Sequence, residues 1–166
     1  VGAFYNQIDS YFYQDNTGLH AQDEHAHEEV HDEDEHEAEE EEGLPVYIYR
    51  QQDVEMYGFE AEFIYQWNSE IKTSLFTDYI NAELKNGDSL PRIPPMRIGG
   101  QLDFQNSTFA AQLSAIHYFD QDNIAERETA TDGYTLVDAN INYYMEGVGD
   151  DFVLFLKANN LTNEDA

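Results

Sequence analysis

Long stretches in which apolar and polar side chains alternate at every second residue constrain this chain most. In residues 57–67 the odd positions are apolar or aromatic and the even positions are mostly polar or charged. Residues 96–104 and 135–143 alternate in the same way, and residues 152–159 do so less cleanly. A period of two is that of a β-strand with one face toward an apolar environment and the other toward water. We therefore expect an all-β protein.

Seven strands are expected, and the connections between them alternate in length. The expected strands are 2–14, 47–67, 71–84, 96–104, 109–119, 134–144 and 151–159. The connection 15–46 is very long, 85–95 and 120–133 are long, and the others are short. Long connections at one end and short turns at the other are typical of outer-membrane β-barrels, which have external loops and periplasmic turns. We expect antiparallel strands of such a barrel, with residues 15–46 outside the cell.

The alternative is a soluble β-sandwich, in which the apolar faces would meet in a core. The expected strand 47–67 is longer than the ~5–6 residues of typical globular strands and suits the ~9–11 residues needed to cross lipid, plus an extension. Tyr65 and Trp67 also precede a tight turn, where an aromatic girdle would meet the membrane interface. Both features favour the barrel, with outer-membrane lipid as the partner of its apolar face.

The net charge of −28 favours cations as partners and excludes nucleic acid. Thirteen of the 35 acidic residues lie in 23–42, where there is no Lys or Arg, and five of the six histidines lie in 20–36. The absence of Cys excludes thiolate sites. Neither a nucleophile elbow nor a phosphate-binding loop occurs, and Ser69 and Ser74 have no expected His partner, so we do not expect an enzyme.

The histidine- and acid-rich segment is the candidate metal site. Imidazole with carboxylate suits divalent transition metals, and zinc takes about four such ligands. The expected ligands are His20, His25, His27, His31, His36, Asp23, Glu24, Glu28 and Asp32. Like charges at i, i+4 oppose a helix here, so the segment is expected to be a disordered external loop that captures Zn²⁺. Copper and nickel stay open, as does a solvated acidic loop whose histidines are incidental.

Four acidic or histidine side chains outside that segment are further candidates for contact with the ion. Glu60, Glu62 and Asp78 are expected on the water-facing side of the sheet, either lining the path of the ion or as ordinary hydrated residues. His117 is expected near the external end of strand 109–119 on the lipid side. At that position an interfacial role is favoured over that of a ligand.

Four segments resemble TonB-dependent outer-membrane receptors. Residues 52–62 contain a Gly-Phe-Glu core that recurs in one strand of that family. Residues 90–100 resemble a late external loop with the strand that it enters, and residues 131–138 resemble another late strand entry. Residues 160–163 are similar to the segment before the last strand. The four segments follow the order of the family over most of the chain.

The resemblance implies an uptake receptor in the cell outer membrane. Such receptors have an N-terminal plug, a TonB-interacting segment and about 22 strands. Residues 1–166 are then expected to be the C-terminal part of the barrel, without the plug, which would contact the TonB complex, and without the final strand. A His- and acid-rich external loop resembles the zinc-uptake receptors. A receptor for copper, nickel or a metal chelate such as a siderophore or haem stays open, as does a soluble metal-buffering β-domain.

Overall fold

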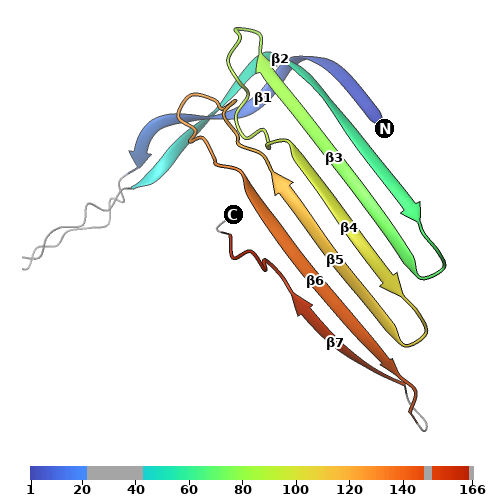
Figure 1. Ribbon diagram of the computed structural model, residues 1–166. Coiled ribbons are helices and arrows are strands. Elements are labelled where there is room, and N and C mark those ends of the chain that lie inside the picture. Colours follow the sequence, from blue (N-terminus) through green and yellow to red (C-terminus); the bar gives the residue numbers. More distant parts are fainter. Residues whose placement is uncertain (22–42, 148–150, 165–166) are drawn as a thin grey trace, which may run out of the picture.

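Seven strands form one antiparallel sheet in the computed structural model, which describes residues 1–21, 43–147 and 151–164. Each strand pairs with the next along the chain, without a crossover (Figure 1). The strands are β1 (Gly2–Ala21), β2 (Leu44–Gln66), β3 (Ile71–Leu84), β4 (Arg97–Gln105), β5 (Phe109–Tyr118), β6 (Tyr134–Met145) and β7 (Phe152–Ala158). No helix of the described residues is long and apolar enough to cross a membrane. The expected all-β fold with seven antiparallel strands is confirmed.

The sheet has one end with long connections and one end with tight turns (Figure 1). The connections 85–96 and 119–133 lie at the same end of the sheet as the last residues of β1 and the first residues of β2. At the other end, Asn68 Oδ1 accepts hydrogen bonds from the N–H groups of two turn residues at 2.8 and 2.9 Å. Asn106 Oδ1 does the same in the next turn. These side chains close the short turns because they replace backbone acceptors.

The register places large apolar side chains of neighbouring strands on one face. Leu102 of β4 lies beside Leu113 of β5, and Ile141 of β6 lies beside Leu156 of β7. Five large aliphatic side chains of β3 to β6 along this face are between 46% and 50% exposed, and they are Leu75, Ile98, Leu102, Leu113 and Ile141. An exposed apolar band that continues from strand to strand is typical of a surface that contacts lipid.

The opposite face of the same strands is polar and carries ion pairs. Arg97 Nε lies 2.7 Å from the Asp78 carboxylate, and Lys72 Nζ lies 3.2 Å from that of Asp103. No second sheet covers this face among the described residues. The described residues form a single sheet, so the two packed sheets of the alternative sandwich are not found among them.

Aromatic side chains lie at the turn end of the apolar face, where an interfacial girdle was expected. Trp67 is 64% exposed, and its indole N–H donates to Thr73 Oγ1 at 2.9 Å. Its ring meets that of Tyr65 edge-on, with the centroids 4.8 Å apart. Phe109 and Tyr143 form a second pair, also at 4.8 Å, next to the following turn. Such rings suit the boundary between lipid and water.

The β1–β2 hairpin is longer than expected. β1 continues to Ala21 and β2 begins at Leu44, so residues 15–21 and 44–46 belong to strands rather than to the expected loop 15–46. Backbone pairing holds at Asp15 and Asn16 and resumes at His20 and Ala21, and between these positions the Thr17 hydroxyl donates to the Val46 carbonyl at 2.7 Å. Within the described residues the hairpin extends past β3 to β7, and these bonds satisfy part of its backbone there. The other strand bounds agree with expectation to within one residue.

A small cluster of buried apolar side chains lies near the outer end of the sheet. It comprises Val54, Ala82, Leu84 and Leu90. Leu90 comes from the connection 85–96, and its N–H donates to the Ala82 carbonyl at 2.9 Å. This connection therefore folds back onto the sheet.

Gly58 allows β1, β2 and β3 to approach closely. A Cβ at this position would lie 2.3 Å from the Tyr79 carbonyl oxygen and 2.9 Å from the Phe4 ring. We expect Gly58→Ala to push β2 away from β3 and to lower the free energy of unfolding of the protein by about 1–3 kcal/mol. Urea unfolding in detergent measures this change.

Gly100→Ala is the matched control, because the nearest atom to its Cβ is the flexible Leu75 Cδ2 at 3.0 Å. Equal free energies of unfolding for the Gly58→Ala and Gly100→Ala proteins would show that the close approach of the strands at Gly58 does not require glycine.

Candidate functional site

The histidine- and acid-rich segment joins two adjacent strand ends at the outer end of the sheet. Ala21 pairs with Leu44, and His20 pairs with Pro45, so the segment leaves and re-enters at neighbouring positions. We call the extension of the hairpin beyond the other strands the stalk, which comprises residues 11–21 and 44–52. Figure 1 shows the stalk bending away from the rest of the sheet. The His20 side chain is exposed at its end.

Of the nine predicted metal ligands, His20 alone lies within the described residues. The other eight lie outside them, and they are His25, His27, His31, His36, Asp23, Glu24, Glu28 and Asp32. Within 1–21, 43–147 and 151–164, no three His, Asp or Glu side chains are grouped so that they could hold a metal ion. The ligand set therefore stays a prediction, and the structure describes the stalk that carries it.

A β-bulge lies where the stalk departs from the sheet. The register of β1 against β2 shifts between Ile8 and Tyr11, and Ser10 adopts a left-handed φ of 57°. The Ser10 N–H donates to Asp53 Oδ1 at 3.0 Å, and Lys85 Nζ lies 2.9 Å from Asp53 Oδ2. Bulges of this kind bend a strand and increase its twist. Asp53 therefore holds the bend from which the stalk begins.

The charge of Asp53 is part of this arrangement, and the group lies beyond the apolar band of the sheet. The hydrogen bond from the Ser10 N–H, followed by the hydrogen bond and charge of Lys85, lowers the pKa of the Asp53 carboxyl below its ordinary value. The same contact raises the pKa of the Lys85 ammonium group. The carboxylate thus favours the bend above its ordinary pKa, and this contribution is lost as the pH falls through the lowered value.

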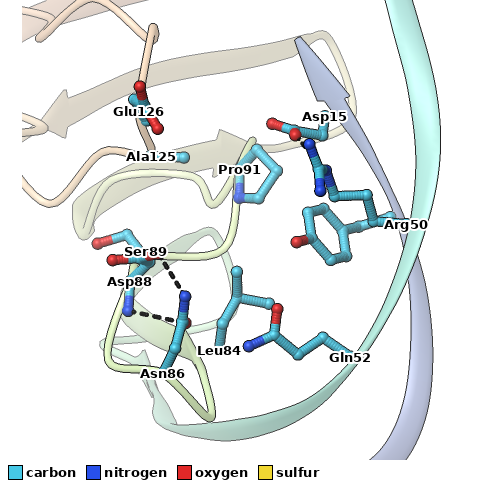
Figure 2. Close-up of a pocket in the computed structure, with 11 residues that line it drawn as sticks. Asp15, Arg50, Gln52, Leu84, Asn86, Asp88, Ser89, Pro91, Ala125 and Glu126 are labelled. Carbon is cyan, nitrogen blue, oxygen red and sulfur yellow. Dashed lines mark hydrogen bonds and ion pairs between the residues drawn. The ribbon is translucent and has the colours of Figure 1, made fainter. Parts of the chain in front are cut away.

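A hollow of about 250 Å³ lies beneath the stalk, between it and the connections 85–96 and 119–133 (Figure 2). The stalk contributes Asp15 and Arg50, whose side chains form an ion pair at 2.5 Å. The loops contribute Asp88 and Glu126. The hollow is acidic on its loop side, but Asp15 is paired with Arg50. Its carboxylates can attract cations by their field.

The polar face contains the three acids that the sequence placed there. Glu60, Glu62 and Asp78 line one hollow of about 540 Å³ together with Arg97. The structure confirms that all three lie on the polar face of the sheet. Arg97 pairs with Asp78, so the Asp78 carboxylate acts as an ion-pair partner in this structure.

His117 lies at the outer end of β5 on the apolar face, as expected. Its register partners are Ile98 of β4 and Thr135 of β6. Its Nδ1 lies 2.9 Å from Thr135 Oγ1, and its ring meets that of Phe119 edge-on at 4.7 Å. These contacts are those of an interfacial residue.

The sequence did not predict the contacts that join the outer loops to each other and to the stalk. Glu128 joins the two loops, because its carboxylate accepts the N–H of Arg92 at 2.7 Å and that of Ala125 at 2.9 Å. No local pattern indicates that residues 36 positions apart form a hydrogen bond.

Comparison with known proteins gives a family and a fold. The family model described as "TonB dependent receptor-like, beta-barrel" matches residues 1–161. Among solved structures, the chain is similar to "Copper transporter OprC", with a TM-score of 0.65 and 20% sequence identity. That match covers 72% of this chain and 20% of the other, so this chain spans about a fifth of the length of that protein.

If Asp53 holds the bend of the stalk, its removal should free the Ser10 amide. We expect Asp53→Ala to increase the hydrogen-exchange rate of the Ser10 N–H several-fold in the full-length receptor, because the carboxylate acceptor is lost. Exchange measured by mass spectrometry on peptides that span the bulge tests this.

Glu55→Ala is the matched control, because the Glu55 carboxylate on the same strand accepts only from the Gln7 side chain among the described contacts. Unchanged protection of Ser10 in the Asp53→Ala receptor would contradict the role of Asp53.

Proposed function

Because the chain belongs to the TonB-dependent receptor-like β-barrel family, we propose that it is part of an outer-membrane receptor that takes up a divalent transition metal, with zinc as the ion. One observation carries the proposal. Five histidines and thirteen acidic residues are concentrated in a segment that joins the two strands of the stalk, at the end of the sheet with the long connections.

Capture would combine charge with ligand chemistry. The field of the acidic residues raises the local concentration of cations and speeds their arrival. Imidazoles then select zinc and its neighbours over calcium and magnesium, which carboxylates alone would bind. Many ligands in one segment support several overlapping sites, and the affinity of each is modest because ordering the chain around an ion costs conformational entropy.

Transport would follow capture across the polar face. The His-rich segment would lie outside the cell and pass the ion to the lumen side of the barrel, which Glu60 and Glu62 line. Energy would come from the TonB complex through a plug domain, as in other receptors of the family. The apolar band would meanwhile contact outer-membrane lipid.

Copper is the second candidate ion, because the similar structure bears the name of a copper transporter. Nickel and a metal chelate are further alternatives. Binding affinity alone does not decide among the metals, since copper binds most histidine sites more tightly than zinc does. Uptake by metal-starved cells with competing ions present is the deciding measurement. A soluble metal-buffering domain is not favoured, because the family model that matches residues 1–161 is that of a receptor β-barrel.

The histidines of the segment should be necessary for zinc uptake. Substitution of His20, His25, His27, His31 and His36 by Ala in the full-length receptor is expected to abolish growth under zinc starvation. The variant should still be present in the outer membrane, because the sheet does not depend on these side chains.

The matched control is His117→Ala, which removes a histidine from the apolar face and should leave uptake unchanged. Normal zinc accumulation by the five-histidine variant would sink the proposal.

Capture should also fail on mild acidification. An ordinary histidine has a pKa of about 6.5, and only the neutral imidazole binds metal. Binding should therefore be complete at neutral pH and lost as the pH falls to about 5, whereas carboxylates with pKa values of about 4 stay charged there. Titration of the purified receptor with zinc at both pH values measures this, and equal binding would mean that carboxylates alone hold the ion.

A further inference from the structure

Two arginines from different outer loops reach the same strand of the stalk. Arg92 Nη1 donates to Gln14 Oε1 at 2.7 Å, and its guanidinium lies 5.1 Å from the centroid of the Tyr47 ring. Arg127 Nη1 donates to the Asn16 carbonyl oxygen, also at 2.7 Å. Each contact joins residues far apart in the sequence. Together they fasten the stalk to both loops.

Both arginines have a left-handed backbone, which is uncommon for residues other than glycine. Arg92 has a φ of 63° and Arg127 a φ of 69°. Such conformations persist where the surroundings hold them in place, and they concentrate at sites with a function. Here Glu128 holds Arg92 through its N–H, while it also fixes the loop of Arg127 through the N–H of Ala125.

The absence of a side chain at Gly18 of the stalk leaves room for the Arg127 guanidinium. Gly18 has a φ of 71°, and a Cβ there would lie 3.1 Å from Arg127 Nε and 3.3 Å from its Cζ. A side chain would therefore crowd the guanidinium, and the backbone conformation itself favours glycine. The second irregularity of β1 against β2, between Asn16 and His20, lies at this point. Both partners of the contact, Arg127 in the loop and Gly18 in the stalk, therefore have the backbone conformation that brings them together.

The placement of positive charge also indicates that the loops are fastened to the stalk. The chain has seven Lys and Arg residues against 35 acids, and three of the seven lie at the stalk: Arg50, Arg92 and Arg127. The Arg50 guanidinium pairs with the Asp15 carboxylate within the stalk itself. Arg92 and Arg127 instead donate from the loops to uncharged acceptors of the stalk, and Arg127 also lies 3.8 Å from the Glu126 carboxylate.

We propose that Arg92 and Arg127 form a clamp that holds the stalk inclined over the hollow beneath it, so that a metal ion captured at the end of the stalk is released toward the lumen. This inference rests on the proposed function and deepens it. The two arginines are positioning residues, since they fix the direction of the stalk and bind no metal. The clamp couples capture to delivery because β3 pairs with β2 only from Val54 onward, so among the described residues the loops hold this side of the stalk.

Arg92→Gly combined with Arg127→Gly removes the clamp with little other disturbance. Glycine accepts the left-handed backbone at both positions, so the loops can keep their course while the guanidinium contacts disappear. Lys72→Ala is the matched control, because it removes an exposed ion pair with Asp103 far from the stalk. The double variant Arg92→Lys and Arg127→Lys keeps a cationic hydrogen-bond donor at each position and should therefore restore much of the clamp.

The direction of the stalk can be measured without metal. Spin labels at Leu19→Cys and Gln105→Cys, both exposed positions, report the distance between the end of the stalk and the turn end of the sheet. In the full-length receptor we expect a narrow distance distribution for the parent and for Lys72→Ala. The double glycine variant should give a several-fold broader distribution, and the double lysine variant should narrow it again. An unchanged distribution in the double glycine variant would overturn the clamp.

Zinc binding and zinc uptake then test delivery. The double glycine variant should bind as many zinc ions per receptor as the parent, while its rate of uptake into zinc-starved cells falls several-fold. A broadened stalk with undiminished uptake would refute the role in delivery. If the parent receptor itself takes up no zinc, the proposed function fails, and the distance measurement still decides whether the clamp exists. Arg127→Gly alone serves where the double variant does not assemble, and the same outcomes apply to it.

Discussion

Backbone pairing between neighbouring strands is the interaction on which the whole structure depends. In lipid no water is present to satisfy an N–H or C=O group, so every such group in the membrane must be paired within the protein. The antiparallel register from β1 to β7 achieves this for the interior strands. Because the side-chain period is two, that register also places Leu102 and Leu113 on one face and the Arg97–Asp78 pair on the other. One set of hydrogen bonds thus creates both the lipid surface and the water-facing wall.

Different forces hold the outer end of the molecule. There the β1–β2 hairpin continues past the point where β3 pairs with β2, and among the described residues side-chain contacts from the loops hold it in place of a third strand. Asp53 fixes the bend at Ser10, Glu128 joins the two loops, and Arg92 and Arg127 connect these loops to the stalk. Exposed contacts of this kind are individually weak and respond to pH and salt.

The sequence was most informative where one physical rule governs many residues in a row. Alternation from Tyr57 to Gln66 in β2, continued by Trp67 in the turn, predicted the strand, its two faces and the aromatic turn end, because lipid on one side and water on the other impose the pattern at every step. It was least informative where single contacts over long separations decide the structure. Residues 15–21 were expected in a loop, since their pairing with the start of β2 leaves little apolar signal. The hydrogen bond of Arg127 to Asn16 spans 111 positions, and no local motif indicates it. The metal ligands were predicted from composition, and all of them except His20 lie outside the described residues.

The central claim is that imidazoles of the segment between β1 and β2 hold the zinc ion. X-ray absorption spectroscopy at the zinc edge, on the full-length receptor loaded with less than one equivalent of zinc, tests this most directly. The account predicts imidazole nitrogen scatterers at about 2.0–2.1 Å together with carboxylate oxygen. It also predicts that the imidazole signal disappears when the five clustered histidines are replaced. A shell of oxygen alone in the parent receptor, or an imidazole signal that survives the replacement, would contradict it.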